Sequence, residues 1–253
     1  MIRVVKIGGR AQSDPVLPRV LSSLAAEAGI RLCIVHGGGD EVTAMQRRLG
    51  GEPRFVDGRR FTAAEDIDVV RMVLSGTINK RLVRQLLAAG VRAVGISGED
   101  GGLLPASRFE NGAMGAVGVP ARAERALLDA LLDRGFVPVV SPVGRDVTTG
   151  AGLNINGDDA AAAIAESLGA DELFLVADVP GVIGPHGESL PFVDLDDVGA
   201  LVEAGVAHSG MAAKLQAGRR ALLGGVRTVR IGDTAALRDR SLGTQLTHSP
   251  SAV

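Results

Sequence analysis

Two glycine clusters lie near the start of the chain, each directly after an apolar run. The first is Lys6-Ile7-Gly8-Gly9, and the second is His36-Gly37-Gly38-Gly39. Glycine lets bare backbone N–H groups approach an anion, and the N-terminus of a following helix adds the positive end of its dipole. Lys6 adds an ammonium group, although a strand-edge lysine that reaches solvent is the alternative. The two clusters together predict one shared site for a highly charged group.

A third polar segment, Asn154-Ile155-Asn156-Gly157-Asp158-Asp159, precedes a run of small residues that is typical of a buried helix. In an extended chain Asn154 and Asn156 point to the same side, and Asp158 follows at the helix start. Capping of this helix by Asp158 or Asp159 is the simpler interpretation of one carboxylate. It does not account for the two spaced asparagines, so the segment is a candidate part of the same site.

The remaining candidates each have a simpler interpretation beside the functional one. Arg59 and Arg60 suit recognition of a carboxylate by a planar guanidinium, but arginines in a loop are equally often just exposed. Lys214 lies near the start of a predicted helix, where lysines are usually solvated. The segment Asp178–Val182 follows a predicted strand and also fits a simple turn. The single cysteine, Cys33, lies in a strand-like run and is expected to be a buried apolar residue.

The composition excludes several classes of protein. The chain has 253 residues, of which 46% are hydrophobic and 22% charged, as in folded globular proteins. A formal net charge of −2, with no tryptophan or tyrosine, argues against nucleic acid or a membrane surface as the main partner. We find no signal-like or membrane-spanning apolar segment and expect a cytoplasmic location. Neither a GxxxxGK[ST] P-loop, a GxGxxG fingerprint nor the protein-kinase motif set is present.

The elements that must position these residues alternate along the chain. Strands separated by helices indicate βαβ units and an open, mostly parallel sheet with helices on both faces, where ligands bind beyond the carboxyl ends of the strands. The predicted strands are Ile2–Ile7, Leu32–Val35, Arg92–Ile96, Val137–Val140, Leu173–Val176 and Thr228–Ile231. The predicted helices are Val16–Ala28, Glu41–Leu49, Ala64–Leu74, Lys80–Ala89, Arg122–Asp133, Asp158–Leu168, Val198–Ala204 and Met211–Leu223. Hairpins and loops are expected at Gly51–Thr62, Gly101–Pro120 and Gly184–Asp194, and a cleft between two lobes at Arg145–Gly152.

Taken in order, these motifs resemble those of the amino acid kinase family, and within it most those of the N-acetyl-L-glutamate kinases. The similarity runs from the two glycine clusters through Gly58–Thr62 and Asn154–Asp158 to Gly210–Lys214. The resemblance implies an α/β, three-layer αβα sandwich with an open, mostly parallel central sheet. It implies a homodimer in which residues 1–150 form a lobe for dimerisation and an acyl-amino-acid substrate, and residues 151–253 a lobe for ATP. The implied activity is ATP-dependent phosphorylation of the γ-carboxylate of N-acetyl-L-glutamate, in arginine biosynthesis.

The resemblance also implies a role for each matching residue. Lys6 and Lys214 match lysines that contact the transferring phosphoryl group, and Asp158 matches the aspartate that orients both. Arg60 and Asn154 match residues that hold the acceptor. The glycines that receive phosphoryl oxygens and substrate are matched by Gly8, Gly9, Gly37 and Gly38. The ATP pocket is matched by Asp178, Val179, Pro180, Gly181, Val182, Ile183, Val206, Ala207, His208, Gly210 and Met211. No metal ligand from the protein is expected, because Mg²⁺ arrives with ATP, held mainly by phosphates and water.

Three residues depart from the pattern of the family. Arg10 stands where a small residue is usual, Arg59 where an aliphatic residue is usual, and Gly157 where alanine is usual. The segments Asn79–Val83 and Ser97–Gly102 also resemble the related carrier-protein aminoadipate kinases of lysine biosynthesis. Aminoadipate or glutamate carried on a small acidic protein is therefore an alternative acceptor, and a non-catalytic nucleotide or amino-acid sensor is an alternative of another class. Because the chain starts directly at its first strand, without the N-terminal helix of arginine-inhibited hexamers, we expect an arginine-insensitive dimer.

Overall fold

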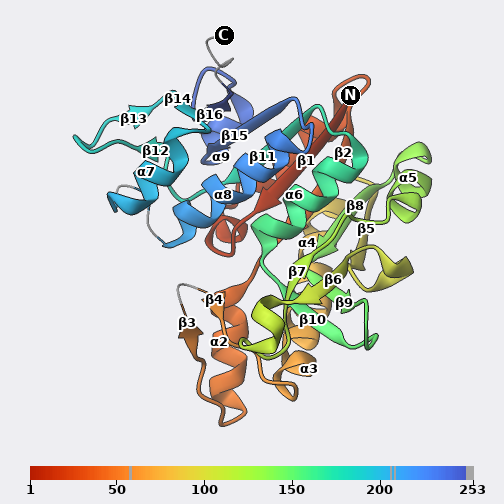
Figure 1. The fold of residues 1–253 in the computed structure, drawn as a ribbon. Helices are drawn as coiled ribbons and strands as arrows, with labels where there is room; N and C mark the ends of the chain where they lie inside the picture. Colours follow the sequence, from red (N-terminus) through yellow and green to blue (C-terminus); the bar gives the residue numbers. More distant parts are fainter. Residues whose placement is uncertain (57–58, 206, 208, 249–253) are drawn as a thin grey trace.

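The central sheet contains every strand that the β-branched runs predicted. A computed structural model describes residues 1–56, 59–205, 207 and 209–248 (Figure 1). Within these residues an eight-stranded sheet has the order β14-β16-β15-β11-β1-β2-β8-β5. Its strands are β1 (Ile2–Ile7), β2 (Arg31–His36), β5 (Ala93–Ser97), β8 (Val137–Ser141), β11 (Glu172–Val176), β14 (Phe192–Asp194), β15 (Thr228–Gly232) and β16 (Thr244–Thr247).

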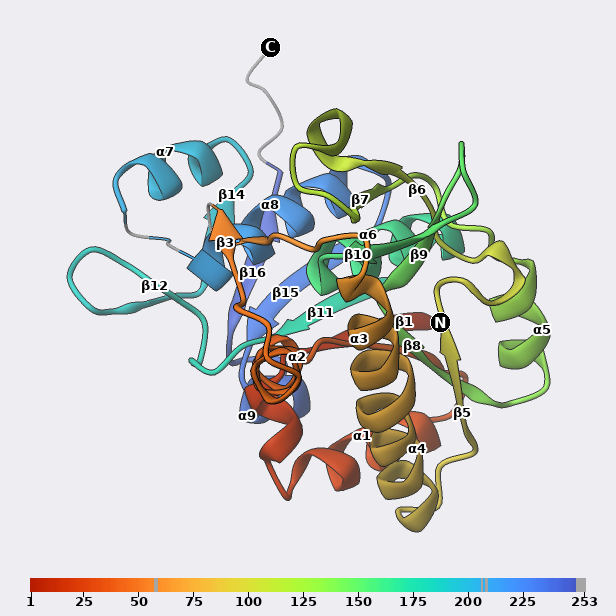
Figure 2. The ribbon, with the colours of Figure 1, turned by 90° about the horizontal axis from the view of Figure 1, so that it is seen from below.

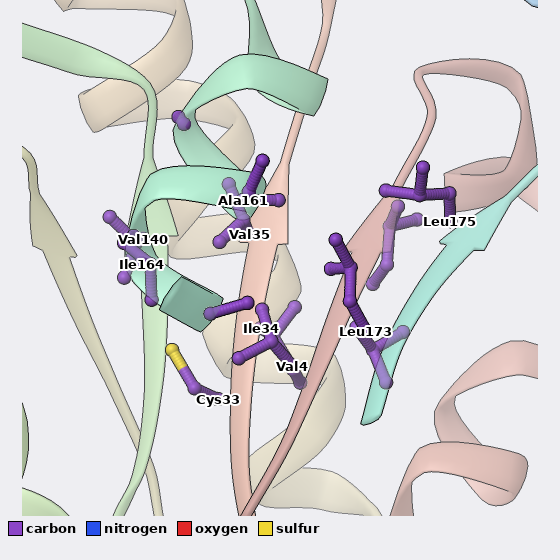
Figure 3. Close-up of a cluster of buried hydrophobic side chains, with 14 of the residues drawn as sticks. Val4, Cys33, Ile34, Val35, Val140, Ala161, Ile164, Leu173 and Leu175 are labelled. Carbon is purple, nitrogen blue, oxygen red and sulfur yellow. The ribbon is translucent and has the colours of Figure 1, made fainter. Parts of the chain in front are cut away.

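The sheet is mostly parallel, and β1 lies in its middle. In the register of β1, Val4 lies beside Cys33 of β2 on one side and Leu173 of β11 on the other. All of β1 is buried, which fits a parallel strand covered on both faces. The exceptions are at one edge: β16 runs antiparallel to β15, and β14 runs parallel to β16. Figure 3 shows Val4, Cys33 and Leu173 in the buried cluster on which one helix rests, so the prediction that Cys33 is a core residue is confirmed.

Helices cover both faces of the sheet, which confirms the predicted αβα sandwich. One face is packed by α5 (Ala126–Asp133), α6 (Gly157–Leu168) and α8 (Ser209–Leu223). The other face is packed by α1 (Leu17–Ala26), α4 (Asn79–Ala88) and α9 (Thr234–Arg238). Figures 1 and 2 show α6 and α8 on the side of the sheet opposite α1 and α4. The short α9 was not predicted; Asp233 caps it by accepting a hydrogen bond from the Ala236 N–H at 2.9 Å.

Outside the central sheet, the described residues form a smaller sheet and two two-stranded hairpins, β3-β4 and β12-β13. The small sheet closes on itself in the order β10-β7-β6-β9, and Figure 1 shows it below the central sheet. Residue 150, the predicted boundary between lobes, lies in the turn between β9 and β10, whose strands pair with each other. The Arg145–Gly152 segment thus forms the end of a hairpin. The bounds are β3 (Phe55–Val56), β4 (Arg59–Arg60), β6 (Pro105–Arg108), β7 (Val117–Pro120), β9 (Val143–Asp146), β10 (Gly152–Ile155), β12 (Val182–Ile183) and β13 (Ser189–Leu190).

One predicted break between helices is absent. The predicted helices Ala64–Leu74 and Lys80–Ala89 left residues 75–79 between them, but α3 (Asp66–Arg71) continues through a π-helix (Met72–Ile78) into α4. The π-helix presses Leu74 and Ile78 against Gly38, where a Cβ atom would lie 2.1 Å from Ile78 Cδ1. Packing against this glycine therefore outweighs the local preference for a break. The other helices are α2 (Gly39–Arg48), α7 (Asp197–Glu203) and the 3₁₀ turns Arg10–Ser13, Asp100–Gly102 and Phe109–Gly112.

In the parts of the chain described above, no helix has the length and apolar character needed to cross a membrane.

Candidate active site

A cavity of about 250 Å³ opens beyond the carboxyl ends of β1 and β2, where the predicted site residues were expected to meet. The rule for open parallel sheets places ligands at this edge. Both glycine clusters, Arg60 and the Asn154–Asp158 segment contribute to its wall. The lining residues are Lys6, Gly9, Gly37, Gly38, Gly39, Val42, Phe55, Arg59, Arg60, Leu74, Val117, Pro142, Asn154, Ile155, Asn156, Gly157 and Asp158.

Asp158 joins two lysines at the base of this cavity. Its Oδ1 atom lies 2.8 Å from Lys6 Nζ, and its Oδ2 atom lies 3.4 Å from Lys214 Nζ. Lys6 is the penultimate residue of β1. Asp158 lies in the first turn of α6, and Lys214 lies in α8. All three side chains are at most 11% exposed. These three residues span more than 200 positions of the sequence, from Lys6 to Lys214, and form one buried cluster of two cations and one anion.

Burial and charge act in opposite directions on this cluster. Burial alone raises the pKa of the Asp158 carboxyl, but the positive charges of Lys6 and Lys214 outweigh it and hold that pKa below its usual value. For Lys214, burial and the nearby charge of Lys6 lower the pKa of the ammonium, and Asp158 opposes this shift. Asp158 is therefore ionised, and it keeps two cations close together in a region that water hardly reaches.

The helix that carries Asp158 is capped by its neighbour. The Asn156 side chain accepts hydrogen bonds from the backbone N–H groups of Asp158 (2.8 Å) and Asp159 (3.4 Å). The simpler interpretation, in which an aspartate caps α6, is therefore wrong. Because Asn156 caps the helix, both carboxylates are free to pair with cations. Gly157, the departure from alanine, leaves room for Lys6, whose Cε atom would lie 3.2 Å from an added Cβ.

The two glycine clusters approach each other closely at the wall of the cavity. A Cβ atom on Gly9 would lie 3.6 Å from Gly38 Cα, and Gly38 has a φ of +154°, where other residues are strained. The Gly37 N–H is already donated to the Ile7 carbonyl at 2.9 Å, so it is not free for a ligand. Among the described residues, neither Gly9 nor Gly38 donates its N–H to a protein acceptor. Gly8 lies beside the Val176 carbonyl and not in the cavity wall.

His36 supports the second glycine cluster through a hydrogen bond to its backbone. Its Nδ1 donates to the Gly37 carbonyl at 2.9 Å, which leaves Nε2 to accept from Asn79 Nδ2 at 3.2 Å. Gln12 Nε2 donates to the same carbonyl at 2.9 Å. Burial lowers the pKa of His36 to about 4, so the ring is neutral at pH 7. This geometry agrees with a structural role for His36. Asn79 belongs to a motif of the resemblance but was given no role there, and Gln12 lies outside the motifs.

Arg60 and Asn154 both line the cavity. The Arg60 guanidinium donates to the Gly39 carbonyl at 2.7 Å and to side chains of α2, and it lies 4.7 Å from the Phe55 ring centre. Burial lowers the pKa of Arg60, but the group stays charged at pH 7. Asn154 Nδ2 donates to Thr62 Oγ1 at 2.9 Å. A cation and an amide thus face a space whose remaining wall is partly apolar.

The described residues predicted to hold the nucleotide lie outside the cavity at Lys6. The segment Asp178–Ile183 leaves β11 and enters β12, where the Val182 N–H donates to Thr244 Oγ1 at 2.7 Å. Gly210 and Met211 lie in the first turn of α8, and Ala207 is buried. Val206 and His208 lie outside the described residues. Of the described residues predicted to bind ATP, none lines the cavity at Lys6.

The two arginines that depart from the family pattern have different environments. Arg10 is 76% exposed and reaches towards Asp178 (3.4 Å) and Asp40 (3.9 Å), between the first glycine cluster and the nucleotide segment. Arg59 is more enclosed, lines the cavity, and donates to Asp159 Oδ2 at 3.1 Å. Sequence reasoning identified both as cations near the acceptor but did not predict these partners.

The charges and hydrogen-bond donors of the site suit a phosphate-like anion. In the portions of the chain that the structure describes, no group of three or more His, Cys, Asp or Glu is arranged to hold a metal ion. Two buried lysines around one carboxylate, beside free glycine N–H groups, suit charge neutralisation in phosphoryl transfer. With the open αβα sandwich, this site defines an α/β phosphotransferase.

Comparison with known proteins gives the family. Residues 1–233 match the model of the amino acid kinase family, and the chain belongs to that family. It is 41% identical over 245 residues to the acetylglutamate kinase of Methanopyrus kandleri, covering 93% of this chain and 96% of that protein. It is 39% identical over 249 residues to the acetylglutamate kinase of Chloroflexus aurantiacus, an alignment that covers 98% of this chain and 97% of that protein. The solved structure of smu.665 from Streptococcus mutans superposes with a TM-score of 0.88 at 27% identity, and the superposition covers 97% of this chain and 98% of that one.

Proposed function

We propose that this protein is an acetylglutamate kinase, which transfers the γ-phosphoryl group of ATP to the γ-carboxylate of N-acetyl-L-glutamate. The product is N-acetylglutamyl 5-phosphate. The observation that carries this proposal is Asp158 between Lys6 and Lys214 at the base of a cavity that also contains Arg60 and Asn154. The relatives named acetylglutamate kinase, which align over nearly the whole chain, support the choice of acceptor.

The chemistry needs alignment and charge neutralisation more than proton transfer. A carboxylic acid with a pKa near 4.3 is already ionised at neutral pH, so the acceptor is a nucleophile without a general base. Lys6, on the acceptor side of Asp158, and Lys214, on the nucleotide side, would contact the oxygens of the phosphoryl group as it moves. Asp158 pairs with both ammonium groups and orients them. The free N–H groups of Gly9 and Gly38 would receive the developing charge.

The two ligands would bind on opposite sides of the lysine pair. The acceptor α-carboxylate would pair with Arg60, and its amide would meet Asn154. ATP would lie along Asp178–Ile183 and the start of α8, with Mg²⁺ held mainly by phosphate oxygens and water. In this proposal residues 1–150 bind the acceptor and form a homodimer in the cytoplasm, and residues 151–253 bind ATP.

A panel of acceptors tests the proposal. The protein, MgATP and hydroxylamine are incubated with N-acetylglutamate, glutamate, N-acetylaspartate or aminoadipate, and the acyl phosphate is trapped as a hydroxamate. We expect N-acetylglutamate to give the highest kcat/KM by at least about tenfold, which corresponds to one well-placed contact. A higher value for another acceptor would overturn the assignment of the substrate, whereas the absence of ADP formation with every acceptor would leave only a non-catalytic nucleotide-binding protein.

A second candidate keeps the chemistry and changes the way the acceptor is presented. Phe55 lines the cavity yet is 55% exposed, and Arg10 stands exposed near the same edge. An apolar ring and a cation at the mouth favour aminoadipate or glutamate on a small acidic carrier protein. The same panel, with the carrier-bound acceptor added, separates the two: preference for the carrier-bound form would support the second candidate. A non-catalytic sensor is the third possibility, and the presence of Lys6, Asp158 and Lys214 together speaks against it.

A further inference from the structure

The residue after the central carboxylate forms a second buried ion cluster. Asp159 is 3% exposed, and each of its oxygens faces a different arginine. Oδ2 accepts from Arg59 Nη1 at 3.1 Å, and Oδ1 accepts from Arg220 Nη2. Successive residues on a helix point about 100° apart, so Asp158 and Asp159 serve different partners from one helix start. Asp158 and Asp159, both in the first turn of α6, thus pair with four cations in total.

The two arginines come from the two sides of the proposed transfer site. Arg59 belongs to β4, next to Arg60, and lines the cavity for the acceptor. Arg220 belongs to α8, the helix that carries Lys214. Asp159 therefore contacts both the acceptor wall and the helix of the nucleotide-side lysine. Both contacts are made by one carboxylate that water hardly reaches.

The helix α8 is consequently held at two points along its length. Lys214 pairs with Asp158, and Arg220 pairs with Asp159. Lys214 and Arg220 are separated by six residues, or about 9 Å along the axis at 1.5 Å per residue. Two anchors at this spacing oppose sliding and rotation of α8 more effectively than one. On the other side, Arg59 stacks 5.1 Å from the Phe109 ring centre, which fixes its planar group against Asp159.

We propose that Asp159 is a positioning residue that holds the acceptor wall, through Arg59, and Lys214, through Arg220 and α8, in the relative placement that transfer requires. This inference rests on the proposed phosphoryl transfer. Phosphoryl transfer loses rate steeply when the donor and acceptor groups shift by as little as 1 Å, because alignment supplies much of the catalysis. Asp159 touches neither reacting group in this arrangement. It acts through the two arginines.

A purely structural ion cluster would behave differently, and a matched control exists in this chain. Glu172 is likewise buried and lies among arginines, with Arg240 Nη2 at 2.7 Å and Arg3 Nε at 2.9 Å, but it lies at the opposite, amino end of the strands. Each carboxylate is buried and has at least one partly exposed arginine partner, and loss of either carboxylate breaks a partly buried ion cluster and is costly to the fold. Only the loss of Asp159 should also change the kinetics.

The experiment compares Asp159→Asn, Arg59→Gln, Arg220→Gln and Glu172→Gln in the full chain. Measured quantities are kcat, the KM for N-acetylglutamate, the KM for MgATP and the thermal midpoint. Arg59→Gln should raise the acceptor KM by about tenfold, more than it lowers kcat. Arg220→Gln should instead lower kcat by about tenfold with little change in the acceptor KM. Asp159→Asn should show both effects, and Glu172→Gln should lower only the thermal midpoint.

The outcomes separate this inference from the proposed function. If Asp159→Asn and Glu172→Gln both lose only thermal stability, or if Arg59→Gln and Arg220→Gln change the same kinetic parameter, the positioning role is overturned. If Asp159→Asn does not fold, the two arginine variants still decide the question. If the wild type turns over no acceptor, the proposed function fails, and calorimetric titrations test the positioning. Weakened acetylglutamate binding only in Arg59→Gln and weakened MgATP binding only in Arg220→Gln would then support it, and unchanged binding would refute it.

Discussion

At the scale of single residues, the chemistry depends on how Asp158 places two cations. Lys6 and Lys214 would repel each other if the carboxylate between them were absent, and both are almost fully buried. The sequence predicted these three residues only through the order of the motifs, since Lys214 alone looked like an ordinary helical lysine. The geometry of the triad depends on tertiary packing and could not be read from local patterns.

Removal of either lysine should lower the rate and leave the fold intact. Lys6→Ala and Lys214→Ala each remove a cation that neutralises the transferring group, so kcat should fall by about 10²- to 10³-fold. Steady-state ATP turnover at saturating acceptor measures this, with circular dichroism as the check on folding. A kcat within threefold of wild type in either folded variant would remove that lysine from the proposed role.

His36 should make stability depend on pH. Burial first, with the neighbouring charges of Arg81 and Lys6 opposed by the hydrogen bond to Gly37, lowers its pKa from 6.5 to about 4. As the pH falls from 6.5, the unfolded chain takes up this proton before the folded chain does, so stability falls between pH 6.5 and 4 and levels off below. The full loss from this group is about 3 kcal/mol.

Urea unfolding at a series of pH values measures this effect. The His36→Gln variant, whose amide still has a donor and an acceptor for Gly37 and Asn79, should lose this part of the pH dependence. The exposed His186 provides the control, since His186→Gln should keep the wild-type profile. An unchanged slope in His36→Gln would show that His36 is not buried as a neutral ring.

At the scale of elements, the capped start of α6 and the close packing of the π-helix against Gly38 shape the site. Strands from β-branched runs and the helices between them were predicted nearly residue for residue, because hydrophobic period and length indicate them locally. The π-helix at Met72–Ile78 was not predicted, because the local residue preferences of its Ser75-Gly76-Thr77 segment favour a break between two helices. It persists because Leu74 and Ile78 pack against Gly38. The cap of α6 was also misassigned, since Asn156, Asp158 and Asp159 are all good capping residues.

Loss of that cap should affect both stability and activity. Asn156→Ala removes the acceptor for two N–H groups of α6 and should lower the free energy of unfolding by about 1 kcal/mol. Because Asp158 lies in the first turn, kcat should fall as well. The control is Asp233→Ala, which removes the cap of α9 far from the cavity and should cost similar stability without a change in kcat. Equal kinetics in the two variants would show that the cap does not position Asp158.

At the scale of the whole molecule, the open sheet collects residues from distant parts of the chain at one edge. The parallel order β11-β1-β2-β8-β5 places the carboxyl ends of five strands together, and the rule for such sheets predicted this edge. What the sequence did not indicate is how the two halves are joined. Residue 150 lies in a hairpin turn, and the ion pairs Lys6–Asp158 and Arg59–Asp159 are among the contacts that join the two halves. Contacts of this kind arise between side chains more than fifty residues apart, so no local pattern reveals them.

The opposite edge of the same sheet should contribute stability without contributing to catalysis. Glu172 pairs with Arg3, Arg230 and Arg240, and Glu172→Gln leaves these cations without a buried counter-charge. The free energy of unfolding should fall by about 3 kcal/mol. Urea unfolding measures it, and kcat serves as the second readout. A large loss of kcat in a folded Glu172→Gln variant would contradict the separation of the two edges.

The central claim is that the Lys6–Asp158–Lys214 cluster transfers a phosphoryl group from ATP to a carboxylate. The most direct measurement is the yield of hydroxamate per ADP formed, with N-acetylglutamate as acceptor, in wild type, Lys6→Ala and Glu172→Gln. The account predicts equal amounts of hydroxamate and ADP in wild type and Glu172→Gln, and a rate lower by about 10²-fold or more in Lys6→Ala. ADP release by the wild type without hydroxamate, or undiminished hydroxamate formation by Lys6→Ala, would contradict it.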